Sequence, residues 1–313
     1  MFEIVRYTPE RTNEWNRFVR RSKNGTFLFD RGYMDYHADR FEDFSLMFYD
    51  DKGLFALLPA NACDQVLHSH QGLTYGGLVM DGRATAAKVC TLFQELNNYL
   101  RQSGFQKVEY KPVPWVYHSL PSEEDLYALF MVCHAALTGR DISSAIPPTH
   151  ALKWRRDRHY NANKAFSNGV LVEKSDDYAA FWEVLTENLL SKYNLRPVHS
   201  LDEIRLLKSR FPEQITLYLA RLDDEVLGGT VIYHCGQANH SQYISATQKG
   251  KRLHAVDALY ERVLLEDECL QGHYFDFGKS TMGHSYDLNE TLMAQKEGFG
   301  ARAVCYDTYE WTV

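Results

Sequence analysis

The sequence lacks any run of about 20 apolar residues, the length that a helix needs to cross the hydrocarbon core of a bilayer. Residues 1–6 also lack the charged leader and apolar stretch that are typical of an export signal. From these two absences we expect a cytoplasmic protein with no membrane span.

Cysteine is infrequent and dispersed, with no CxxC pair among its six occurrences. Structural zinc sites and disulfide frameworks need closely spaced cysteines, so we expect neither. In a cytoplasmic setting the thiols should be reduced, and buried or half-buried. The six are Cys63, Cys90, Cys133, Cys235, Cys269 and Cys305.

Other site patterns are missing as well. His68-Ser69-His70 could bind a metal superficially, but it has no acidic partner at ligand spacing and there is no HExxH, so we predict no metal site. No GxSxG elbow and no GxxxxGK[ST] loop occurs, which leaves a serine hydrolase or a P-loop hydrolase without support. The letters Asp276-Phe277-Gly278 occur in protein kinases, but the kinase glycine-rich loop, strand lysine and HRD loop do not accompany them.

An excess of positive charge is also absent. The chain has 34 basic and 41 acidic residues, which gives a net charge of −7. Proteins that bind nucleic acids broadly neutralise phosphates with lysine and arginine. The charge therefore disfavours tRNA as a partner, although a local basic groove is compatible with it.

The length of 313 residues exceeds the usual size of one hydrophobic core, so we predict two domains. Hydrophobic residues make up 45% of the chain and aromatic residues 13%, which is enough for two cores. A basic stretch at 153–164, predicted to be helical, follows Pro147-Pro148, and proline fixes the chain conformation there. We therefore place the boundary near residue 150, with domains at 1–149 and 150–313.

Both halves show the same order of elements: an amphipathic helix, two antiparallel strands joined by an Asp/Gly turn, a third strand, a crossover helix and a last strand. Each crossover helix ends at a glycine, as helices commonly do. The fold class is therefore α/β (α+β), a tandem duplication with mixed sheets and crossover helices. A crossover of this kind sets two strands in parallel, and ligands favour the carboxyl ends of such strands. The predicted elements are 14–21, 45–49, 54–59, 73–79, 84–100 and 107–110, and then 178–193, 215–220, 226–233, 241–245, 253–270 and 273–277.

A cationic turn precedes the second crossover helix. It reads Gln248-Lys249-Gly250-Lys251-Arg252, whereas the equivalent stretch 80–83 of the first half has one base and one acid. Amide groups at a helix start, three cations and a glycine suit an anion, which favours the second half as the binder of a phosphate-bearing donor. An ordinary solvated basic turn explains the stretch equally well.

Two further groups follow the last crossover strand. Gly278 permits close approach of the backbone to a ligand. Asp276 could be a general base, a helix-capping group or a satisfied core carboxylate. Lys296 lies near the end of a helix predicted at 289–297, where it either complements the helix dipole or points into the cleft and polarises an acyl carbonyl.

The chain resembles Fem-type proteins, two-domain members of the GNAT acyltransferase superfamily, and particularly their shorter FemAB-like relatives. The similarity covers nearly the whole chain. It implies tandem GNAT-like domains with a channel between them, and transfer of an acyl or aminoacyl group to an amine. The fragments that carry it are Tyr75-Gly76-Gly77-Leu78, Arg155 to Ala165 with Gly169, Tyr274 to Gly278, Leu288 to Leu292, and Gln295-Lys296-Glu297-Gly298-Phe299-Gly300.

The resemblance also implies roles for individual residues. Lys296 would lie in the active channel, while Glu109 and Lys111 of the first domain would face the acceptor. Fem enzymes use aminoacyl-tRNA and a peptidoglycan precursor, and other GNAT proteins use acyl-CoA. The chain departs from these patterns in lacking an inserted helical arm and in having a degenerate pyrophosphate signature at 248–253, so the donor stays open.

The leading hypothesis is an N-acyltransferase of cell-envelope or small-molecule metabolism. Acyl-CoA or acetyl-CoA would bind residues 248–252 and Gly278, and a small-molecule or peptidoglycan-precursor-like amine would bind Tyr75 and Lys111. Asp276 or Glu109 would accept the proton. The alternative is a non-catalytic GNAT-fold ligand-binding protein, which would be indicated by a closed cleft in the second domain.

Overall fold

A computed structural model describes residues 1–149, 151–267, 270–283 and 286–313. Contacts divide the chain into two compact units. Unit 1 comprises Met1–Ile142, Gly283–Tyr286 and Val304–Val313, and unit 2 comprises Ser143–Met282 and Asp287–Ala303.

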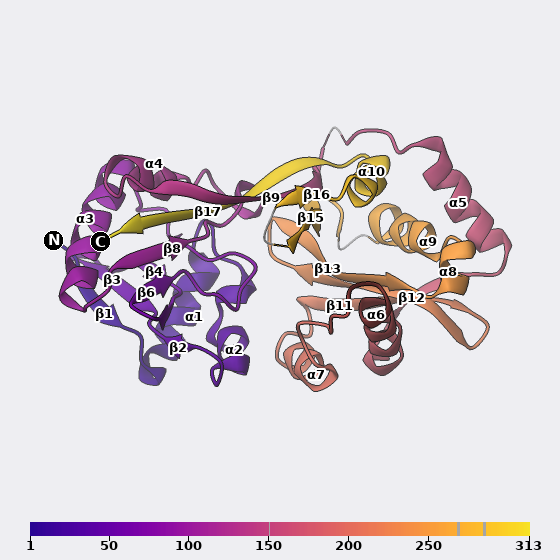
Figure 1. Ribbon diagram of the computed structural model, residues 1–313, viewed down its shortest axis with the longest axis horizontal. Coiled ribbons are helices and arrows are strands. Elements are labelled where there is room, and N and C mark those ends of the chain that lie inside the picture. The colour runs from indigo at the N-terminus through magenta and orange to yellow at the C-terminus, as the bar shows by residue number, and fades with distance from the viewer. Residues whose placement is uncertain (150, 268–269, 284–285) are drawn as a thin grey trace. The chain divides into compact units, whose positions relative to one another are not determined.

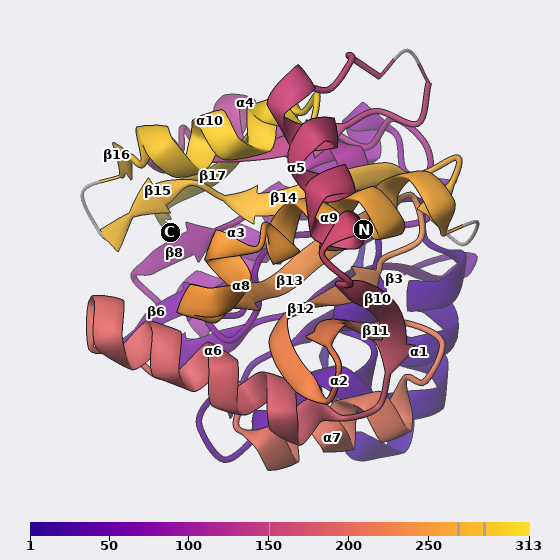
Figure 2. The ribbon, with the colours of Figure 1, turned by 90° about the vertical axis from the view of Figure 1, so that its right-hand side faces the viewer.

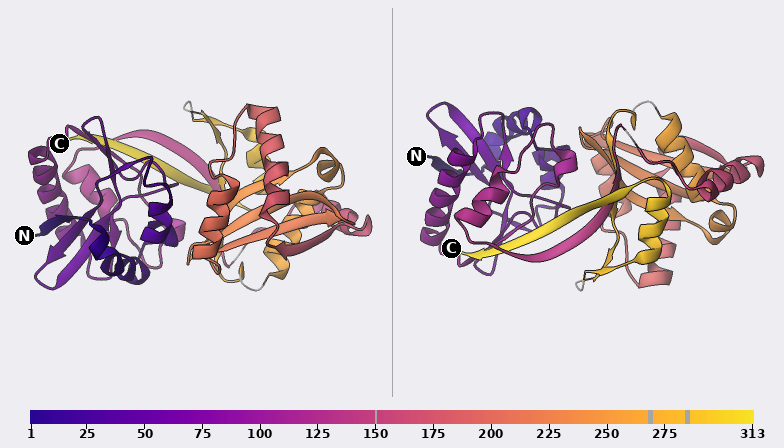
Figure 3. Two further views of the ribbon diagram at one scale, coloured as in Figure 1. Left: turned by 90° about the horizontal axis from the view of Figure 1, so that it is seen from below. Right: turned by 90° about the horizontal axis from the view of Figure 1, so that it is seen from above.

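Two long strands carry the chain across this division. Strand β9 (Ala136–Ile146) enters unit 2, and β17 (Arg302–Thr312) returns to unit 1. The two strands are neighbours in one sheet and run side by side in Figure 3. The single domain boundary predicted near residue 150 does not include the return of the chain to unit 1. The chain returns because β17 pairs antiparallel with β8 (Lys107–Tyr110).

Unit 1 contains two sheets. One has the order β1-β3-β4-β7, and the other runs β17-β8-β6-β5-β2 within the unit. A core that includes Phe48, Phe93 and Trp311 joins sheets and helices. The elements are β1 (Glu3–Arg6), α1 (Thr12–Arg21), α2 (Arg31–Met34), β2 (Glu42–Asp43), β3 (Leu46–Asp50), β4 (Gly53–Leu58), β5 (Asn61–Cys63), β6 (Val66–His68), β7 (Val79–Met80), α3 (Ala86–Gln102), β8 and α4 (Glu124–Met131).

The strand predicted at 73–79 is wrong. Only β7 forms there, and the parallel neighbour of β8 is β6 rather than this segment. One close backbone approach and one backbone dihedral angle explain the difference. A Cβ on Gly76 would lie 1.8 Å from the Ser69 carbonyl oxygen, and Gly77 has a φ of +80°, which a strand does not adopt.

Unit 2 is built on the strand order β10-β11-β12-β13-β14-β9. The predicted parallel pair is confirmed, because β13 and β14 run parallel with the register Ala238↔Tyr274 to His240↔Asp276. The elements are α5 (Arg156–Ser167), β10 (Leu171–Ser175), α6 (Tyr178–Tyr193), α7 (Leu201–Arg210), β11 (Ile215–Leu222), β12 (Glu225–His234), β13 (Ala238–Ala246), α8 (Gln248–Arg252), α9 (Ala255–Glu261), β14 (Tyr274–Lys279), β15 (Thr281–Met282), β16 (Asp287–Leu288) and α10 (Glu290–Gly298).

The crossover helix of unit 2 is interrupted, although a single helix was predicted at 253–270. His254 adopts a left-handed φ of +58° and separates α8 from α9. A π-helical stretch at Arg262–Glu266 then ends the helical segment, and the predicted range extends into residues 268–269, which lie outside the described chain.

Helices cover both faces of the unit 2 sheet, as Figures 1 and 2 show. Helices α9 and α10 lie on one face, and α6 and α7 on the other. Phe275 and Phe277 of β14 point toward the α9 side, where they contact Tyr260, while Phe299 packs on the same cluster. Because side chains alternate along a strand, Asp276 faces the opposite side from these two phenylalanines.

The five described cysteines are unbridged. The expectation that all thiols are buried or half-buried is wrong for Cys63 and Cys305, which are exposed because they lie on β5 and β17 with their side chains turned outward. Cys269 lies outside the described residues.

Candidate active site in unit 2

A cavity of about 300 Å³ opens at the carboxyl end of β13 and is lined by residues of unit 2 alone. Its walls come from α6, α8, α9 and α10, and they are mostly apolar, with a few polar groups. That composition is typical of a small-molecule site. The lining residues are Leu185, Asn188, Leu189, Lys192, Ile244, Ser245, Ala246, Lys251, Val256, Tyr260, Leu292, Gln295, Lys296 and Phe299.

Lys296 points inward from α10, with 6% of its surface exposed. Its Nζ donates to the Gly278 carbonyl oxygen at 2.7 Å, to the Lys279 carbonyl oxygen at 2.8 Å and to Ser280 Oγ at 2.9 Å. Three donated hydrogen bonds require the ammonium form. The Lys296 side chain is therefore buried at the wall of the cavity and is not exposed at the end of α10.

Burial lowers the pKa of Lys296 from 10.5 to about 8, because removal from water penalises the ammonium, while the nearby Asp276 carboxylate opposes the shift. An ammonium that deprotonates near pH 8 can stabilise a developing oxyanion below that pH and not above it.

We therefore expect the kcat/KM of the protein to fall as pH rises through about 8. The Lys296→Arg variant should lack this alkaline limb, since a guanidinium keeps its proton throughout the range. Steady-state rates between pH 6 and 10 measure both. An identical alkaline limb in Lys296→Arg would show that Lys296 is not the group that titrates.

Asp276 is a fully buried carboxylate on β14. Its oxygens accept hydrogen bonds from Ser143 Oγ, from the Gly278 N–H at 3.1 Å and from His240 Nδ1 at 2.9 Å. Of the three roles predicted for Asp276, this arrangement is that of a satisfied buried carboxylate, because several donors already occupy it.

Gly278 has a φ of +77°, a conformation that residues with a Cβ rarely adopt. The register between β14 and β9 shifts between Asp276 and Lys279, so Gly278 lies in an irregularity of the strand. This turn directs the Gly278 carbonyl oxygen toward Lys296 Nζ. The structure thus gives Gly278 a part in holding Lys296.

The cationic turn, residues 248–252, forms α8. Its cationic side chains have different surroundings. Lys251 lines the cavity and donates to Asn188 Oδ1 at 2.9 Å. Lys249 is half-buried and pairs with Glu225, while Lys251 and Arg252 are both exposed. One cation of the three therefore lines the cavity.

The remaining residues of the turn serve packing. Gly250 is buried, and a Cβ there would lie 2.1 Å from the Leu227 carbonyl oxygen, so glycine allows α8 to approach β12. The Gly250 N–H is taken by the Thr247 hydroxyl at 2.9 Å. Gln248 begins α8 and is exposed.

A polar recess adjoins the cavity and shares Lys251, Val256 and Gln295 with it. Its volume is about 270 Å³, and Arg158, His254, Asp257 and Thr291 complete the lining. Arg158 is held by an ion pair of 2.9 Å with Asp257. The cavity is therefore mostly apolar, and the adjoining recess is polar and contains the cationic side chains of Arg158 and Lys251.

Sequence reasoning missed Asn188. Its side-chain amide donates to Ser245 Oγ at 2.6 Å and to the Ala246 carbonyl oxygen at 2.7 Å, so it ties α6 to the end of β13 beside Lys251. An asparagine inside an amphipathic helix is a weak signal, because its polar partner lies 57 residues away in the chain.

The residues predicted to face an acceptor lie in unit 1. Glu109 lies 3.5 Å from His68 Nδ1 and 3.1 Å from Lys111 Nζ. The interaction with His68, followed by that with Lys111, lowers the pKa of Glu109 to about 2, which makes it a poor proton acceptor. Tyr75 is 2% exposed and packs against Phe29 and Tyr117, so it has a core position.

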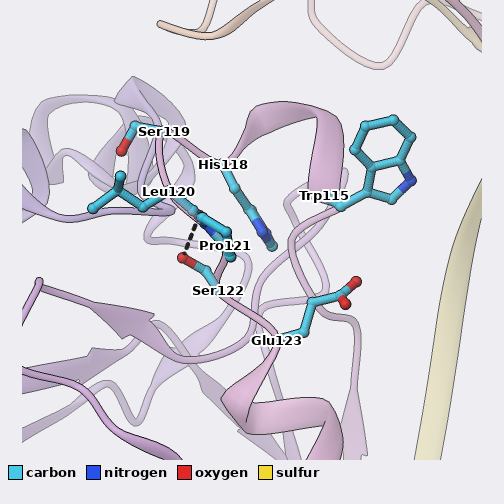
Figure 4. A pocket seen from close by; sticks show the side chains of 7 residues that line it. All are labelled: Trp115, His118, Ser119, Leu120, Pro121, Ser122 and Glu123. Carbon is cyan, nitrogen blue, oxygen red and sulfur yellow. Dashed lines mark hydrogen bonds between the residues drawn. The ribbon is translucent and has the colours of Figure 1, made fainter.

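Unit 1 also contains a cavity of about 390 Å³, shown in Figure 4. No sequence pattern indicates this cavity, because its residues come from one irregular segment that includes Trp115 and Glu123. Burial lowers the pKa of His118 in this loop to about 4, and its Nε2 lies 2.9 Å from the Val113 carbonyl oxygen. The lining comprises Trp115, His118, Ser119, Leu120, Pro121, Ser122 and Glu123.

Among the described residues, no cluster of three or more histidine, cysteine, aspartate or glutamate side chains could hold a metal ion. In the same part of the chain, no helix combines the length and apolar character needed to cross a membrane.

Residues 153–286 match the family model of the acetyltransferase (GNAT) domain. The matched segment contains β13, α8, α9 and β14. No curated protein sequence matches the chain.

Several solved structures share the fold of the whole chain. FemX aligns with a TM-score of 0.70 at 11% identity, covering 99% of this chain and 97% of its own. The C-terminal domain of a putative lysylphosphatidylglycerol synthetase from Agrobacterium fabrum aligns with a TM-score of 0.63 at 11% identity, covering 96% and 92%. A tandem GNAT protein from the clavulanic acid biosynthesis pathway aligns with a TM-score of 0.54 at 10% identity, covering 100% and 98%. The predicted fold class, a tandem duplication of GNAT-like domains, is confirmed.

Proposed function

We propose that the protein is an N-acyltransferase that binds an acyl or aminoacyl donor in the cavity of unit 2 and transfers the acyl group to an amine. The observation that carries the proposal is the convergence of Lys296 and Lys251 on one cavity at the carboxyl end of β13. The GNAT match over residues 153–286 supports the same class of reaction.

The chemistry follows from the positions of these groups. The acceptor amine attacks the carbonyl carbon of a thioester or ester, and negative charge develops on the carbonyl oxygen. The Lys296 ammonium stabilises that oxygen by exchanging its bond to the Ser280 hydroxyl for one to the substrate. The two backbone carbonyls of Gly278 and Lys279 keep Nζ in place.

The donor would lie along the cavity and its polar recess. The apolar section, between α6 and β13, suits an acyl chain or another extended apolar group. Lys251, at the junction of the two spaces, suits a phosphate, and acyl-CoA, acetyl-CoA and aminoacyl-tRNA all contain phosphates in addition to the reactive carbonyl group.

Unit 1 is proposed to bind the acceptor. Glu109 and Lys111 form an ion pair at the end of β8, which offers both charges to a small-molecule amine or a peptidoglycan-precursor-like amine. The fold shared with FemX supports an acceptor of the peptidoglycan-precursor type.

The non-catalytic alternative is not favoured, because a closed cleft was its expected sign and the unit 2 cavity is open. A ligand that binds only the native state raises the midpoint of thermal unfolding. CoA, acetyl-CoA and alanyl-tRNA, each titrated against the protein, should therefore give a concentration-dependent rise for one donor class. If a donor binds but no acyl group is transferred to any of a panel of amines, the protein is a ligand-binding protein and not an enzyme.

We expect Lys251→Ala to raise the KM for the donor about tenfold, because a charge-assisted hydrogen bond to a phosphate contributes roughly 1.5–3 kcal/mol. Lys249→Ala is the matched control: it removes the same charge from the same helix, but at a position that pairs with Glu225 and does not line the cavity. Its KM should stay within twofold of the wild type. Equal effects of the two substitutions would indicate a general charge effect and not a contact with the donor.

A further inference from the structure

We infer that unit 1 binds a small organic cation, an ammonium group attached to a short apolar body, in the cavity lined by residues 115 and 118–123. Every residue of this lining lies within Met1–Ile142, and none lines the unit 2 cavity. The site does not depend on the proposed acyl transfer. Its volume of about 390 Å³ is within the range of small-molecule sites.

His118 presents a hydrogen-bond acceptor to this cavity. Its Nε2 lies 2.9 Å from the Val113 carbonyl oxygen, and because a carbonyl can only accept, Nε2 carries the hydrogen. Burial lowers the pKa of His118 to about 4, so the ring is neutral at pH 7 and Nδ1 keeps its lone pair. Among the described residues, no donor is bonded to this nitrogen.

The two serines of the lining also offer lone pairs and no free hydrogen. Ser119 Oγ donates to the Lys23 carbonyl oxygen at 3.0 Å. Ser122 Oγ donates to the Leu120 carbonyl oxygen at 2.9 Å. A hydroxyl has one hydrogen and two lone pairs, so both hydroxyls can only accept from a ligand. A ligand that satisfies these groups must therefore donate hydrogen bonds.

Glu123 gives the cavity a negative charge. It is the N-cap residue of α4, but its carboxylate accepts no hydrogen bond from the first turn of that helix. The neighbouring cation, Lys23, is already paired with Glu124 and donates to the Pro121 carbonyl oxygen at 3.2 Å. Glu123 forms no ion pair within the described part of the chain. Figure 4 shows the Glu123 carboxylate and the His118 imidazole projecting toward the same space.

Trp115 and Leu120 supply apolar surface beside these polar groups, with exposed fractions of 50% and 55%. In Figure 4 the indole nitrogen of Trp115 is on the side of the ring away from His118. The face of an indole ring attracts a cation. An ammonium ion therefore finds a charge, acceptors and an aromatic surface in one cavity, whereas an anion meets a carboxylate and a neutral alcohol gains no charge interaction.

Isothermal titration calorimetry of the full chain with three ligands of similar size tests the site. The ligands are phenethylammonium, 2-phenylethanol and phenylacetate, which differ in charge and in the number of donors. We expect phenethylammonium to bind about tenfold more tightly than 2-phenylethanol, because its hydrogen bonds are charge-assisted, and phenylacetate to give no heat of binding. Raising the salt concentration from about 50 mM to about 500 mM should weaken the binding of phenethylammonium alone.

Two variants assign the effect to the cavity. Glu123→Gln keeps the shape of the side chain and removes its charge, so the Kd for phenethylammonium should rise about fivefold, the upper range for an exposed charge pair. Glu3→Gln is the matched control, because it removes an exposed carboxylate of unit 1 that does not line the cavity. His118→Phe keeps an aromatic ring but removes the Nδ1 acceptor, and it should raise the Kd about tenfold.

Equal affinity of the wild type for phenethylammonium and 2-phenylethanol would overturn the site. The same Kd for phenethylammonium in Glu123→Gln and Glu3→Gln would also overturn it. His118→Phe leaves the Val113 carbonyl oxygen without its donor. Should that variant fail to fold, Glu123→Gln carries the test, since the Glu123 side chain is exposed and makes no cap hydrogen bond.

Discussion

Replacing Lys296 by methionine should lower kcat by about 10²–10³-fold, the range found when one oxyanion donor is removed. The side chain of methionine has a similar length and fills the same space, so the packing of α10 on β14 should persist. What is lost is the ammonium that donates to Gly278, Lys279 and Ser280. Transfer assays measure the rate, and donor-dependent thermal shifts confirm that the cavity still binds.

Ser280→Ala is the control that separates catalysis from scaffolding. It removes one of the three acceptors of Lys296 Nζ while keeping the charge. If the third N–H serves the acyl carbonyl in the transition state, Ser280→Ala should retain kcat within a few fold. A Lys296→Met protein that turns over at the wild-type rate would remove the assigned role of the lysine.

Replacing Gly250 by alanine should destabilise unit 2 by about 1–3 kcal/mol, the usual cost of overpacking. The added Cβ would lie 2.1 Å from the Leu227 carbonyl oxygen and 2.9 Å from its carbonyl carbon, and both are backbone atoms of β12 that cannot rotate away. The higher helix propensity of alanine offsets up to about 1 kcal/mol of this cost. Because α8 must move away from the sheet, Lys251 should also lose its position in the cavity.

Gly82→Ala provides the matched control, because a Cβ at Gly82 meets nothing within 4 Å. Thermal and urea unfolding should show a lower midpoint for Gly250→Ala and an unchanged midpoint for Gly82→Ala. Donor affinity should fall in the first variant alone. A Gly250→Ala protein with wild-type stability and affinity would contradict the close packing of α8 on β12.

The sequence was informative where a local period reflects burial. The helix predicted at 84–100 is α3, and the strands predicted at 215–220 and 226–233 are β11 and β12. Each has one face or both faces in a core, so apolar residues recur with the period of the element. The return of β17 to unit 1 has no such local signal, since it depends on pairing with β8 about 200 residues earlier in the chain.

The site was predicted in part for the same reason. Lys296 and Lys251, both singled out from the sequence, line the unit 2 cavity. The surroundings of Asp276 could not be predicted, because they depend on the register between β13 and β14, which brings His240 opposite it from 36 residues away. The roles of the glycines in the sequence motifs were equally ambiguous. Gly300 has a φ of +86° and lies against the Leu152 carbonyl oxygen, so it is required for packing and does not by itself indicate a ligand.

The most direct test of the account is donor binding by unit 2. The unfolding temperature of the wild type, Lys251→Ala and Lys249→Ala should be measured while CoA, and in parallel alanyl-tRNA, is titrated. We predict a rise in the unfolding temperature of the wild type and of Lys249→Ala with one of these donors, and a smaller rise for Lys251→Ala at every concentration. No rise with either donor, or the same rise in all three proteins, would contradict it.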